Sequence, residues 1–251
     1  MVKTINLSDI TFRKISREEV SPMLINNHYL HRMPPLSVAY GAIYNNNIIG
    51  VLTFGKPPSN SLCKGICGDE WSSSVYELNR LYTIDDSPKN LESKFISFAL
   101  NDLKTKNWII VSYADKGMGH SGYIYQATNW IYTGLSAKRT DVYVGEGLHS
   151  RTYTEEQRNF VIRSVRSMKH RYVYMCGDKR FKKNALNALK YPIIKEYPKE
   201  KPEHYKSGDA ERKWLYNKNT KKLFTQEEFL RNTRKYLSEE EYDDYMRIYK
   251  Q

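Results

Sequence analysis

The sequence predicts an α/β protein with an open central sheet, and three observations support this prediction. The chain has 251 residues, of which 40% are hydrophobic, which is enough to bury a full core. Along residues 10–132, short apolar runs rich in β-branched and aromatic residues alternate with segments of helical periodicity. The run 108–114 (Trp-Ile-Ile-Val-Ser-Tyr-Ala) has the composition of an interior strand, and Asp115 follows it directly.

The predicted elements follow one another in a regular order. A first strand covers 10–15, and Ser16 with Glu19 three residues later forms a capping-box pattern for a helix that runs toward Asn26. Asn45–Asn47 separates two β-rich runs and predicts a hairpin. The elements beyond the helix are strands at 37–44 and 48–54, a loop at 55–74, a strand at 75–84, a turn at 85–90, a helix at 91–106, a strand at 108–115, a short helix at 121–129 and a strand from 130. The short helix at 121–129 would place Tyr125 and Asn129, four residues apart, on one face.

The domain organisation predicted from these patterns is one α/β catalytic domain over 1–199 and a linker with a helical tail over 200–251. Residues 199–208 are polar and contain proline, as linkers do. Thr225 and Ser238 each begin a capping-box pattern, which predicts amphipathic helices between 225 and 249. This tail could be a solvated appendage or a contact through which a homodimer forms.

Composition excludes several classes of protein. No apolar run approaches 18 residues and no charged leader precedes an apolar segment, so we expect neither a membrane span nor a signal peptide, but a cytoplasmic protein. Three cysteines, Cys63, Cys67 and Cys176, are too few and odd in number for a disulfide framework. Cys63 and Cys67 lack a second pair of ligands nearby, which disfavours a zinc site.

The positive charge is concentrated in the second part of the chain. Residues 1–150 hold 15 Lys and Arg against 13 Asp and Glu, whereas residues 151–251 hold 25 against 15. Between Arg158 and Lys190 ten basic residues accompany one acid, Asp178, so segment 158–199 is predicted to contact the phosphates of double-stranded DNA. A solvated basic surface is the alternative. The candidate DNA contacts are Arg166, Lys169, Arg171, Lys179, Arg180, Lys182 and Lys183.

Three side chains able to do chemistry surround the end of the strand at 108–115. In open α/β sheets ligands bind at the carboxyl ends of strands, which is where Asp115 and His120 fall. Tyr125, on the following short helix, is expected to face the same opening. The alternative is that Asp115 caps the following turn and that His120 is a surface loop residue.

The order of elements resembles the GNAT acyltransferase fold over residues 10–199. In that family two central strands splay apart, and cofactor and acceptor meet in the gap; here these strands would be 75–84 and 108–115. The resemblance implies that Tyr125 protonates the leaving group and that Glu77 is a carboxylate base. GNAT proteins carry a glycine-rich pyrophosphate loop after the fourth strand, whereas this chain has Asp85-Asp-Ser-Pro-Lys-Asn90. Use of acetyl-CoA is therefore doubtful.

Two longer motifs are similar to the phage Mom DNA-modification family. They are Glu77-Leu-Asn-Arg-Leu-Tyr-Thr-Ile-Asp-Asp-Ser-Pro-Lys-Asn-Leu-Glu-Ser-Lys-Phe-Ile96, and Ser112-Tyr-Ala-Asp followed by Gly119-His-Ser-Gly and Ile124-Tyr-Gln-Ala-Thr-Asn-Trp130. The resemblance implies a phage- or prophage-encoded enzyme of the bacterial cytoplasm that attaches a carbamoylmethyl (acetamido) group to the exocyclic N6 of adenine in DNA. Such a base protects DNA from restriction. The resemblance also implies that iron could take part, with His28, Asp115 and His120 as candidate ligands.

The chemistry of this reaction assigns provisional roles. Glu77 or Asp115 could be the base that an adenine amine requires, and Arg80 and Lys89 could stabilise negative charge, although Arg80 could instead pair with Asp85 or Glu77. The candidates for substrate contact are Arg80, Lys89, Asn90, Ser93, Tyr113, Gln126, Asn129, His28 and Tyr29. Two other functions remain open: an N-acetyltransferase acting on a small amine or protein, and a noncatalytic DNA-binding protein.

Overall fold

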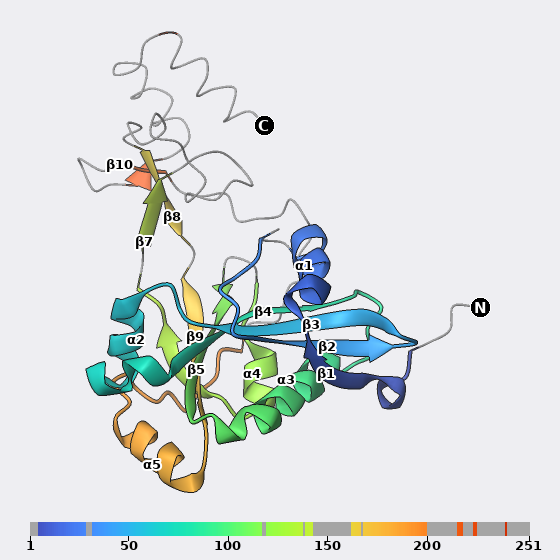
Figure 1. Ribbon diagram of the computed structural model, residues 1–251. Helices are drawn as coiled ribbons and strands as arrows, with labels where there is room; N and C mark the ends of the chain where they lie inside the picture. Colours follow the sequence, from blue (N-terminus) through green and yellow to red (C-terminus); the bar gives the residue numbers. More distant parts are fainter. Residues whose placement is uncertain are drawn as a thin grey trace. The chain divides into compact units, whose positions relative to one another are not determined.

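The chain forms two compact units, which a computed structural model describes over residues 5–28, 32–116, 119–137, 139–142, 162–166, 168–199, 215–217, 223–224 and 239. The first unit consists of residues 1–115, 119–135 and 169–207, and the second of residues 116–118, 136–168 and 208–251 (Figure 1). The sequence predicts a single domain over 1–199 that includes residues 136–168. In the structure, residues 136–168 belong to the same compact unit as residues 208–251. Neither unit is continuous in sequence.

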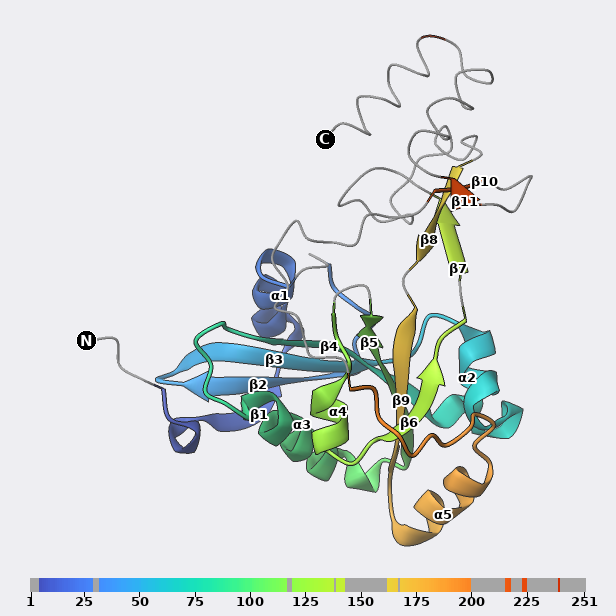
Figure 2. The ribbon, with the colours of Figure 1, turned by 180° about the vertical axis from the view of Figure 1, so that it is seen from behind.

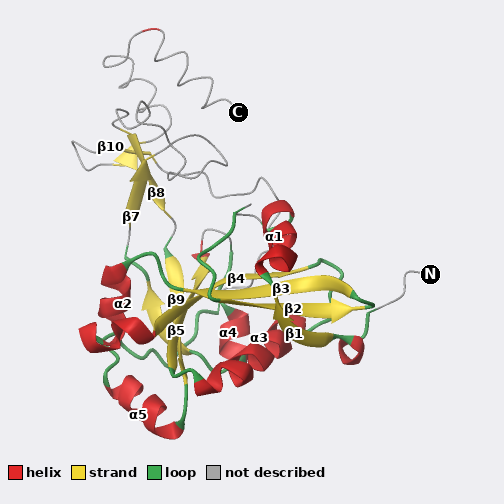
Figure 3. Cartoon of the chain, viewed as in Figure 1, coloured by secondary structure: helices red, strands yellow, loops and turns green. Residues whose placement is uncertain are grey.

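The first unit is built on a seven-stranded mixed sheet of order β1-β2-β3-β4-β5-β9-β6 (Figure 3). Every neighbouring pair is antiparallel except β4 and β5, which are parallel. Helices flank the sheet, so the predicted α/β fold is confirmed. The strands are β1 (Thr11–Ile15), β2 (Val38–Tyr44), β3 (Asn47–Gly55), β4 (Val75–Thr83), β5 (Trp108–Asp115), β6 (Ile131–Leu135) and β9 (Lys169–Cys176). The helices are α1 (Arg17–Asn26), α2 (Asn60–Cys67), α3 (Leu91–Asp102), α4 (Tyr123–Ala127) and α5 (Lys179–Asn187). Three short 3-10 turns are η1 (Leu7–Asp9), η2 (Asp69–Ser74) and η3 (Leu103–Thr105).

Local signals in the sequence form as predicted at the start of the chain. The Ser16 hydroxyl accepts a hydrogen bond from the Glu19 amide, and the Glu19 carboxylate accepts one from the Ser16 amide, which completes the capping box of α1. Asn45 and Asn46 turn the β2–β3 hairpin with φ of 47° and 63°. Asparagine tolerates this left-handed conformation better than most residues, which explains the Asn-rich turn.

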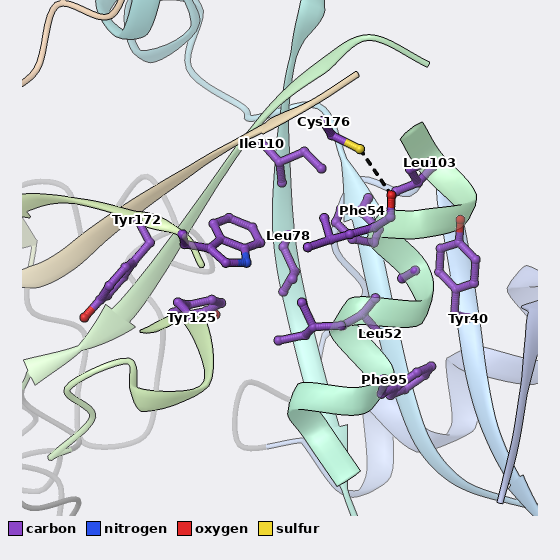
Figure 4. Close-up of a cluster of buried hydrophobic side chains, with 14 of the residues drawn as sticks. Tyr40, Leu52, Phe54, Leu78, Phe95, Leu103, Ile110, Tyr125, Tyr172 and Cys176 are labelled. Carbon is purple, nitrogen blue, oxygen red and sulfur yellow. Dashed lines mark hydrogen bonds between the residues drawn. The ribbon is translucent and has the colours of Figure 1, made fainter. Parts of the chain in front are cut away.

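Alternation along the strands produces two packed faces. Tyr40, Leu52, Phe54 and Ile110 pack with Phe95 of α3 in the larger core, to which α4 contributes Tyr125 (Figures 2 and 4). On the opposite face, Val20 and Leu24 of α1 pack on Ala39 and Val51. Ile66 of α2 and Ala185 of α5 pack on Val111, Val173 and Met175 on that same opposite face. Helices α3 and α4 therefore cover one side of the sheet, and α1, α2 and α5 the other.

The loop predicted over 55–74 is wrong, because it contains α2 and η2. The Ser59 hydroxyl caps α2 by accepting a hydrogen bond from the Leu62 amide. Cys63, Ile66 and Cys67 recur at helical spacing and are buried against β4, β5 and β9. This helix is short and contains Gly and two Cys, so its stability depends on tertiary packing rather than on local propensity.

The predicted helix over 121–129 is shorter than expected, since α4 ends at Ala127. Asn129 follows in the left-handed conformation, with φ of 61°, and is exposed, whereas Tyr125 is buried. The expectation that Tyr125 and Asn129 share a helix face is therefore wrong. Asn129 ends the helix and redirects the chain into Trp130 and β6.

The second unit contains a four-stranded sheet of order β11-β10-β8-β7. Its strands are β7 (Arg139–Val142), β8 (Ile162–Arg166), β10 (Leu215–Asn217) and β11 (Leu223–Phe224). The C-terminal segment thus pairs with the insertion that separates β6 from β9. The helices predicted between 225 and 249, and the dimer contact assigned to them, lie outside the described residues apart from Glu239. No helix among the residues that the structure describes is long and apolar enough to span a membrane.

Candidate active site

The site is created where β4 and β5 part. Their parallel pairing covers only Val75–Glu77 on β4 and Ile109–Val111 on β5, although both strands continue beyond it. Past this point β5 stays paired with β9 over its full length. The splayed sheet predicted from the sequence is thereby confirmed.

A bulge in β4 lies next to this divergence. The register between β3 and β4 shifts between Thr53 and Phe54, which leaves Asn79 as an extra residue. The Asn79 amide oxygen accepts from the Thr53 hydroxyl at 2.6 Å, and its nitrogen donates to the Pro35 carbonyl at 2.8 Å. Bulges bend a strand and re-aim its side chains, so these bonds fix the direction in which β4 leaves β5.

Ser112 links the two strands just beyond their last paired residues. Its Oγ lies 2.8 Å from the Leu78 carbonyl oxygen and 2.8 Å from the Tyr125 hydroxyl oxygen. A serine hydroxyl has one hydrogen and a carbonyl can only accept, so when Ser112 donates to Leu78 it accepts from Tyr125. Two hydrogen bonds thus connect the Tyr125 hydroxyl through Ser112 to the backbone of β4. Tyr125 thus lies beside the divergence of β4 and β5, on the face of the sheet opposite Asp115 rather than at one opening with it.

The Tyr125 ring is held by aromatic neighbours. It is 6% exposed and lies 5.1 Å, between ring centroids, from both Trp130 and Tyr172. The Tyr172 hydroxyl donates to the Ser121 carbonyl at 2.5 Å and accepts from the Gln126 side chain at 3.2 Å. Burial raises the pKa of Tyr172 to about 12. Tyr172 is therefore a protonated positioning residue, and the Gln126 side chain is bonded to it.

Close packing also demands glycine at position 122. Its φ is +83°, and a Cβ atom there would lie 2.4 Å from the Tyr172 ring. Only glycine combines this backbone conformation with such an approach. Gly122 therefore sets the distance at which α4 presents Tyr125 to the divergence.

The candidate bases lie on the opposite face of the sheet from Tyr125. Ser112 alternates with Val111 and Tyr113, which pack toward α2 and α5. Glu77 is the neighbour of Val111 in the parallel pair. Burial raises the pKa of the Cys63 thiol of α2, and the charge of the Glu77 carboxylate adds to that rise. Glu77, Tyr113 and Asp115 thus share one face, while Ser112 and Tyr125 share the other. The candidate acid, Tyr125, and a candidate base on the other face could contact the same substrate only if that substrate lay in the gap between β4 and β5.

Asp115 ends β5 in an ion pair. Its carboxylate lies 2.9 Å from Nζ of Lys169, the residue that it faces on β9. The Asp115 carbonyl accepts from the His120 amide at 3.1 Å. Surrounding protein atoms lower the pKa of the exposed His120 ring by displacing water, and the Asp115 carboxylate opposes that shift. The backbone bond to His120 closes the following turn, while the Asp115 carboxylate itself is bonded to Lys169 on β9.

Distance along the strand separates the two carboxylates. Asp115 is four residues beyond Val111, the partner of Glu77, so about 13 Å of extended chain divides them. Glu77 directly precedes Leu78, whose carbonyl is joined through Ser112 to Tyr125. Of the two candidates, Glu77 is therefore the better placed to act together with Tyr125.

The turn between β4 and α3 is closed by its own side chains. The Thr83 hydroxyl donates to Glu92 in the first turn of α3, and the Ser87 hydroxyl donates to Thr83. The Leu91 amide is bonded to the Pro88 carbonyl, and the Ser93 hydroxyl to the Asn90 carbonyl. A pyrophosphate would bind at the N-terminus of α3, where the negative charge of Glu92 would repel it. Lys89 and Asn90 are exposed in this turn.

The remaining predicted residues are dispersed. The Arg80 guanidinium donates to the Asn79 carbonyl on β4. His28 is 5% exposed, and Tyr29 lies outside the described residues. Within the described part of the chain, no three His, Cys, Asp or Glu side chains gather as a metal site would require. The candidate ligands His28, Asp115 and His120 therefore do not form such a group there.

The predicted DNA contacts belong to three separate elements. Arg166 lies on β8 of the second unit, Lys169 and Arg171 on β9, and the others on α5. Arg171 is 9% exposed; its guanidinium donates to Thr133 and lies 3.4 Å above the Tyr191 ring. Arg171 thus belongs to the interior and is removed from the proposed DNA surface. Lys179, Arg180, Lys182 and Lys183 are exposed on α5.

Sequence reasoning missed Ser112, the Leu78 carbonyl and Tyr172. A serine in the otherwise apolar run 108–114 was the available signal for Ser112, because a buried hydroxyl requires a partner. The Leu78 carbonyl gave no signal, since a backbone carbonyl carries no residue identity. Tyr172 stood out only as an aromatic residue among the cations of 158–190, which did not indicate its contact with Tyr125.

Comparison with known proteins identifies relatives of the chain. The sequence model of the Mom protein family matches residues 9–199. The chain is also 29% identical over 142 residues to the methylcarbamoylase Mom of Escherichia phage Mu, which covers 55% of this chain and 55% of that protein. The chain thus spans about half the length of this curated relative.

Solved structures of acetyltransferases are similar to the chain at low identity. An N-acetyltransferase from Staphylococcus aureus has 15% identity and a TM-score of 0.43, covering 67% of this chain and 99% of that one. A GNAT family acetyltransferase from Elizabethkingia anophelis, solved with acetyl-CoA bound, has 12% identity and a TM-score of 0.41, covering 66% and 98%. The fold assignment rests on the strand order and divergence described above.

Removing the Tyr125 hydroxyl should abolish turnover without unfolding the protein. We expect Tyr125→Phe to reduce the rate of group transfer about 100-fold or more, because it removes the hydroxyl of the candidate proton donor and keeps the ring. Stability should fall by only about 1 kcal/mol, the typical value of one hydrogen bond. Tyr40→Phe is the matched control, because it removes another buried tyrosine hydroxyl. Tyr40 lies on β2, two strands away from β4, and its hydroxyl donates to the Asp102 carboxylate of α3 at 2.7 Å. Equal activity loss in both variants would contradict the assignment.

Amide substitutions should rank the two carboxylates. Glu77→Gln should reduce the rate about 100-fold or more, as expected for loss of a general base. Asp115→Asn should leave the rate within about tenfold and lower stability by about 1 kcal/mol or less, since its ion pair with Lys169 is partly exposed. Single-turnover kinetics and thermal denaturation measure both effects. The opposite ranking would return the base to Asp115.

Coenzyme A should bind weakly or not at all. The turn at 85–90 lacks the glycines that let backbone amides approach a pyrophosphate, and Glu92 adds negative charge at the start of α3. Calorimetric titration at low ionic strength measures this directly. Saturable micromolar binding would show that the turn rearranges, and would restore acetyl-CoA as the donor.

Proposed function

Because the chain belongs to the Mom protein family, we propose that it is a phage-type DNA-modifying transferase that attaches a carbamoylmethyl (acetamido) group to the exocyclic N6 of adenine. The observation that carries the proposal is the family match over 9–199, which includes every residue of the strand divergence. The name of the phage Mu relative, methylcarbamoylase, supports the nature of the group transferred.

The chemistry of adenine explains why both faces of the divergence would be used. The lone pair of the exocyclic amine is delocalised into the ring, so the amine is a weak nucleophile that must lose a proton as it attacks. In the proposed reaction the N–C bond forms as the bond from carbon to the leaving group breaks. Glu77 takes the proton from the amine, and Tyr125 gives its proton to the leaving group. Holding both partners in the gap supplies the remaining acceleration.

Double-stranded DNA is the proposed partner. The target amine lies within the base stack, so the base must leave the helix before it can enter a gap between two strands. The four exposed cations of α5 would contribute phosphate contacts that position the duplex without reading its sequence. Lys169 is less suited to this role, because Asp115 already neutralises it.

An N-acetyltransferase is the second candidate, and the splayed sheet with Tyr125 at the gap favours it. The same acid and base would serve transfer to a small amine or to a protein. The closed turn at 85–90 counts against a coenzyme A donor, as described above. A noncatalytic DNA-binding protein would need the bond from Ser112 to the Leu78 carbonyl for folding, but it would need no proton donor at Tyr125.

Nucleoside analysis tests the proposed function. In DNA from cells that express the protein, a fraction of deoxyadenosine should gain the mass of a carbamoylmethyl group, while the other three nucleosides stay unchanged. Liquid chromatography with mass spectrometry measures this. Cells expressing Tyr125→Phe should show no modified base, and cells expressing Tyr40→Phe should show it. An unaltered profile with soluble, folded wild-type protein in several hosts would refute the proposal.

A further inference from the structure

A polar cavity lies in the first unit, apart from the divergence of β4 and β5. Its volume is about 270 Å³, and its walls come from the last turns of α3, η3, the turn after α4, the end of β9 and the start of α5. Cys176, in its wall, is paired with Trp108, whereas Asp115 is at the other end of β5. Ser112 lies opposite Tyr172, so about 13 Å of β9 separates the level of Ser112 from the cavity.

The groups that line this cavity suit an anion. Two cations, Lys104 and Lys182, reach it from different elements. Asn101 and Asn129 add side-chain amides that can donate, whereas the Ser97 hydroxyl donates to the Ser93 carbonyl at 2.8 Å; none of the lining residues that the structure describes is an acid. Nζ of Lys104 donates to the Asn101 Oδ1 atom at 3.3 Å, which orients the amide so that its nitrogen remains available as a donor.

Negative groups near the cavity are engaged elsewhere. Asp102 accepts from Lys14 at 2.8 Å and from Tyr40 at 2.7 Å, and Asp178 caps α5 by accepting from the Phe181 amide at 2.7 Å. The Leu100 carbonyl accepts from the Cys176 thiol at 3.4 Å (Figure 4). Burial raises the pKa of Cys176 to about 11, so its thiol is neutral at physiological pH. The charge presented to a ligand is therefore positive.

We propose that this cavity is a binding site for a phosphate group. Two lysines with two side-chain amides match the charge and hydrogen-bonding capacity of phosphate oxygens. A volume near the lower end for small-molecule pockets fits a phosphate ester and not a whole dinucleotide cofactor. The phosphate could belong to a small nucleotide or to the DNA backbone, and the second case rests on the proposed function.

The site differs from the pyrophosphate position of acyltransferase folds. That position would be the turn at 85–90, before the first residue of α3, whereas the cavity uses the end of α3 and η3. A helix of twelve residues is about 18 Å long, so the two places are separated by most of its length. Failure of coenzyme A to bind would therefore not remove this site.

Paired charge-neutralising variants test the proposal in the full-length protein. Lys104→Gln with Lys182→Gln removes both cavity cations. Lys106→Gln with Lys195→Gln is the matched control, because it removes the same charge from exposed residues that do not line the cavity. The probes are inorganic phosphate and adenosine monophosphate, with adenosine as the phosphate-free control, followed by calorimetry or phosphorus NMR at low salt. Circular dichroism and thermal denaturation verify folding.

We expect wild type and the control pair to bind phosphate and adenosine monophosphate equally, and the cavity pair to bind them about tenfold or more weakly. Equal losses in the two pairs, or no saturable binding of either probe by the wild type, would overturn the site. Because this readout needs no DNA and no turnover, unmodified nucleosides alongside intact phosphate binding would refute only the proposed function.

A second arm distinguishes the source of the phosphate. With a duplex of about 20 base pairs, the salt dependence of fluorescence anisotropy reports the number of phosphates contacted. This arm uses Lys104→Gln, which leaves the α5 cations in place, with Lys106→Gln as its control. If a backbone phosphate occupies the cavity, Lys104→Gln should bind duplex about tenfold more weakly than Lys106→Gln and lower the salt slope by about one. If a small nucleotide occupies it, both variants should bind duplex alike while differing in their affinity for adenosine monophosphate.

Discussion

The early end of the pairing between β4 and β5 is the constraint on which the rest of the site depends. Backbone groups that leave a sheet ladder inside a protein must find other partners, because an unmet buried carbonyl costs about 1–3 kcal/mol. The Leu78 carbonyl meets this demand through Ser112, and Ser112 in turn orders Tyr125. The serine that satisfies the carbonyl of the departing strand is thus also the residue that holds the Tyr125 hydroxyl beside the divergence. Full pairing of β5 with β9 keeps the other side of the gap rigid.

Alternation along β5 divides the chemistry between two faces. Glu77 and Asp115 lie on the side of α2 and α5, and Tyr125 on the side of α3 and α4. A transfer reaction benefits from this division, since the nucleophile and the leaving group approach and depart in opposite directions. It also explains why Asp115, about 13 Å further along the strand, is better suited to hold Lys169 than to share a substrate with Tyr125.

Folding distributes the basic residues that are continuous in the sequence. Lys169 pairs with Asp115, Arg171 is buried against Thr133 and Tyr191, and the cations of α5 remain exposed at the opposite end of β9. Desolvating a guanidinium is costly unless its donors are bonded, and Arg171 meets this condition with protein groups alone. Net charge therefore indicated a polyanionic partner for the chain but could not indicate which cations would meet it.

The sequence by itself determined the elements whose signals are local. The capping box of Ser16 and Glu19, the Asn45–Asn46 turn and the apolar run of β5 depend on neighbouring residues, and each formed as expected. Tertiary structure alone decided that β9 lies between β5 and β6, that α2 folds within an apparent loop, and that Glu77 rather than Asp115 adjoins Ser112. These features depend on strand register and on packing between distant segments. Neither register nor long-range packing produces a periodic pattern in the local sequence.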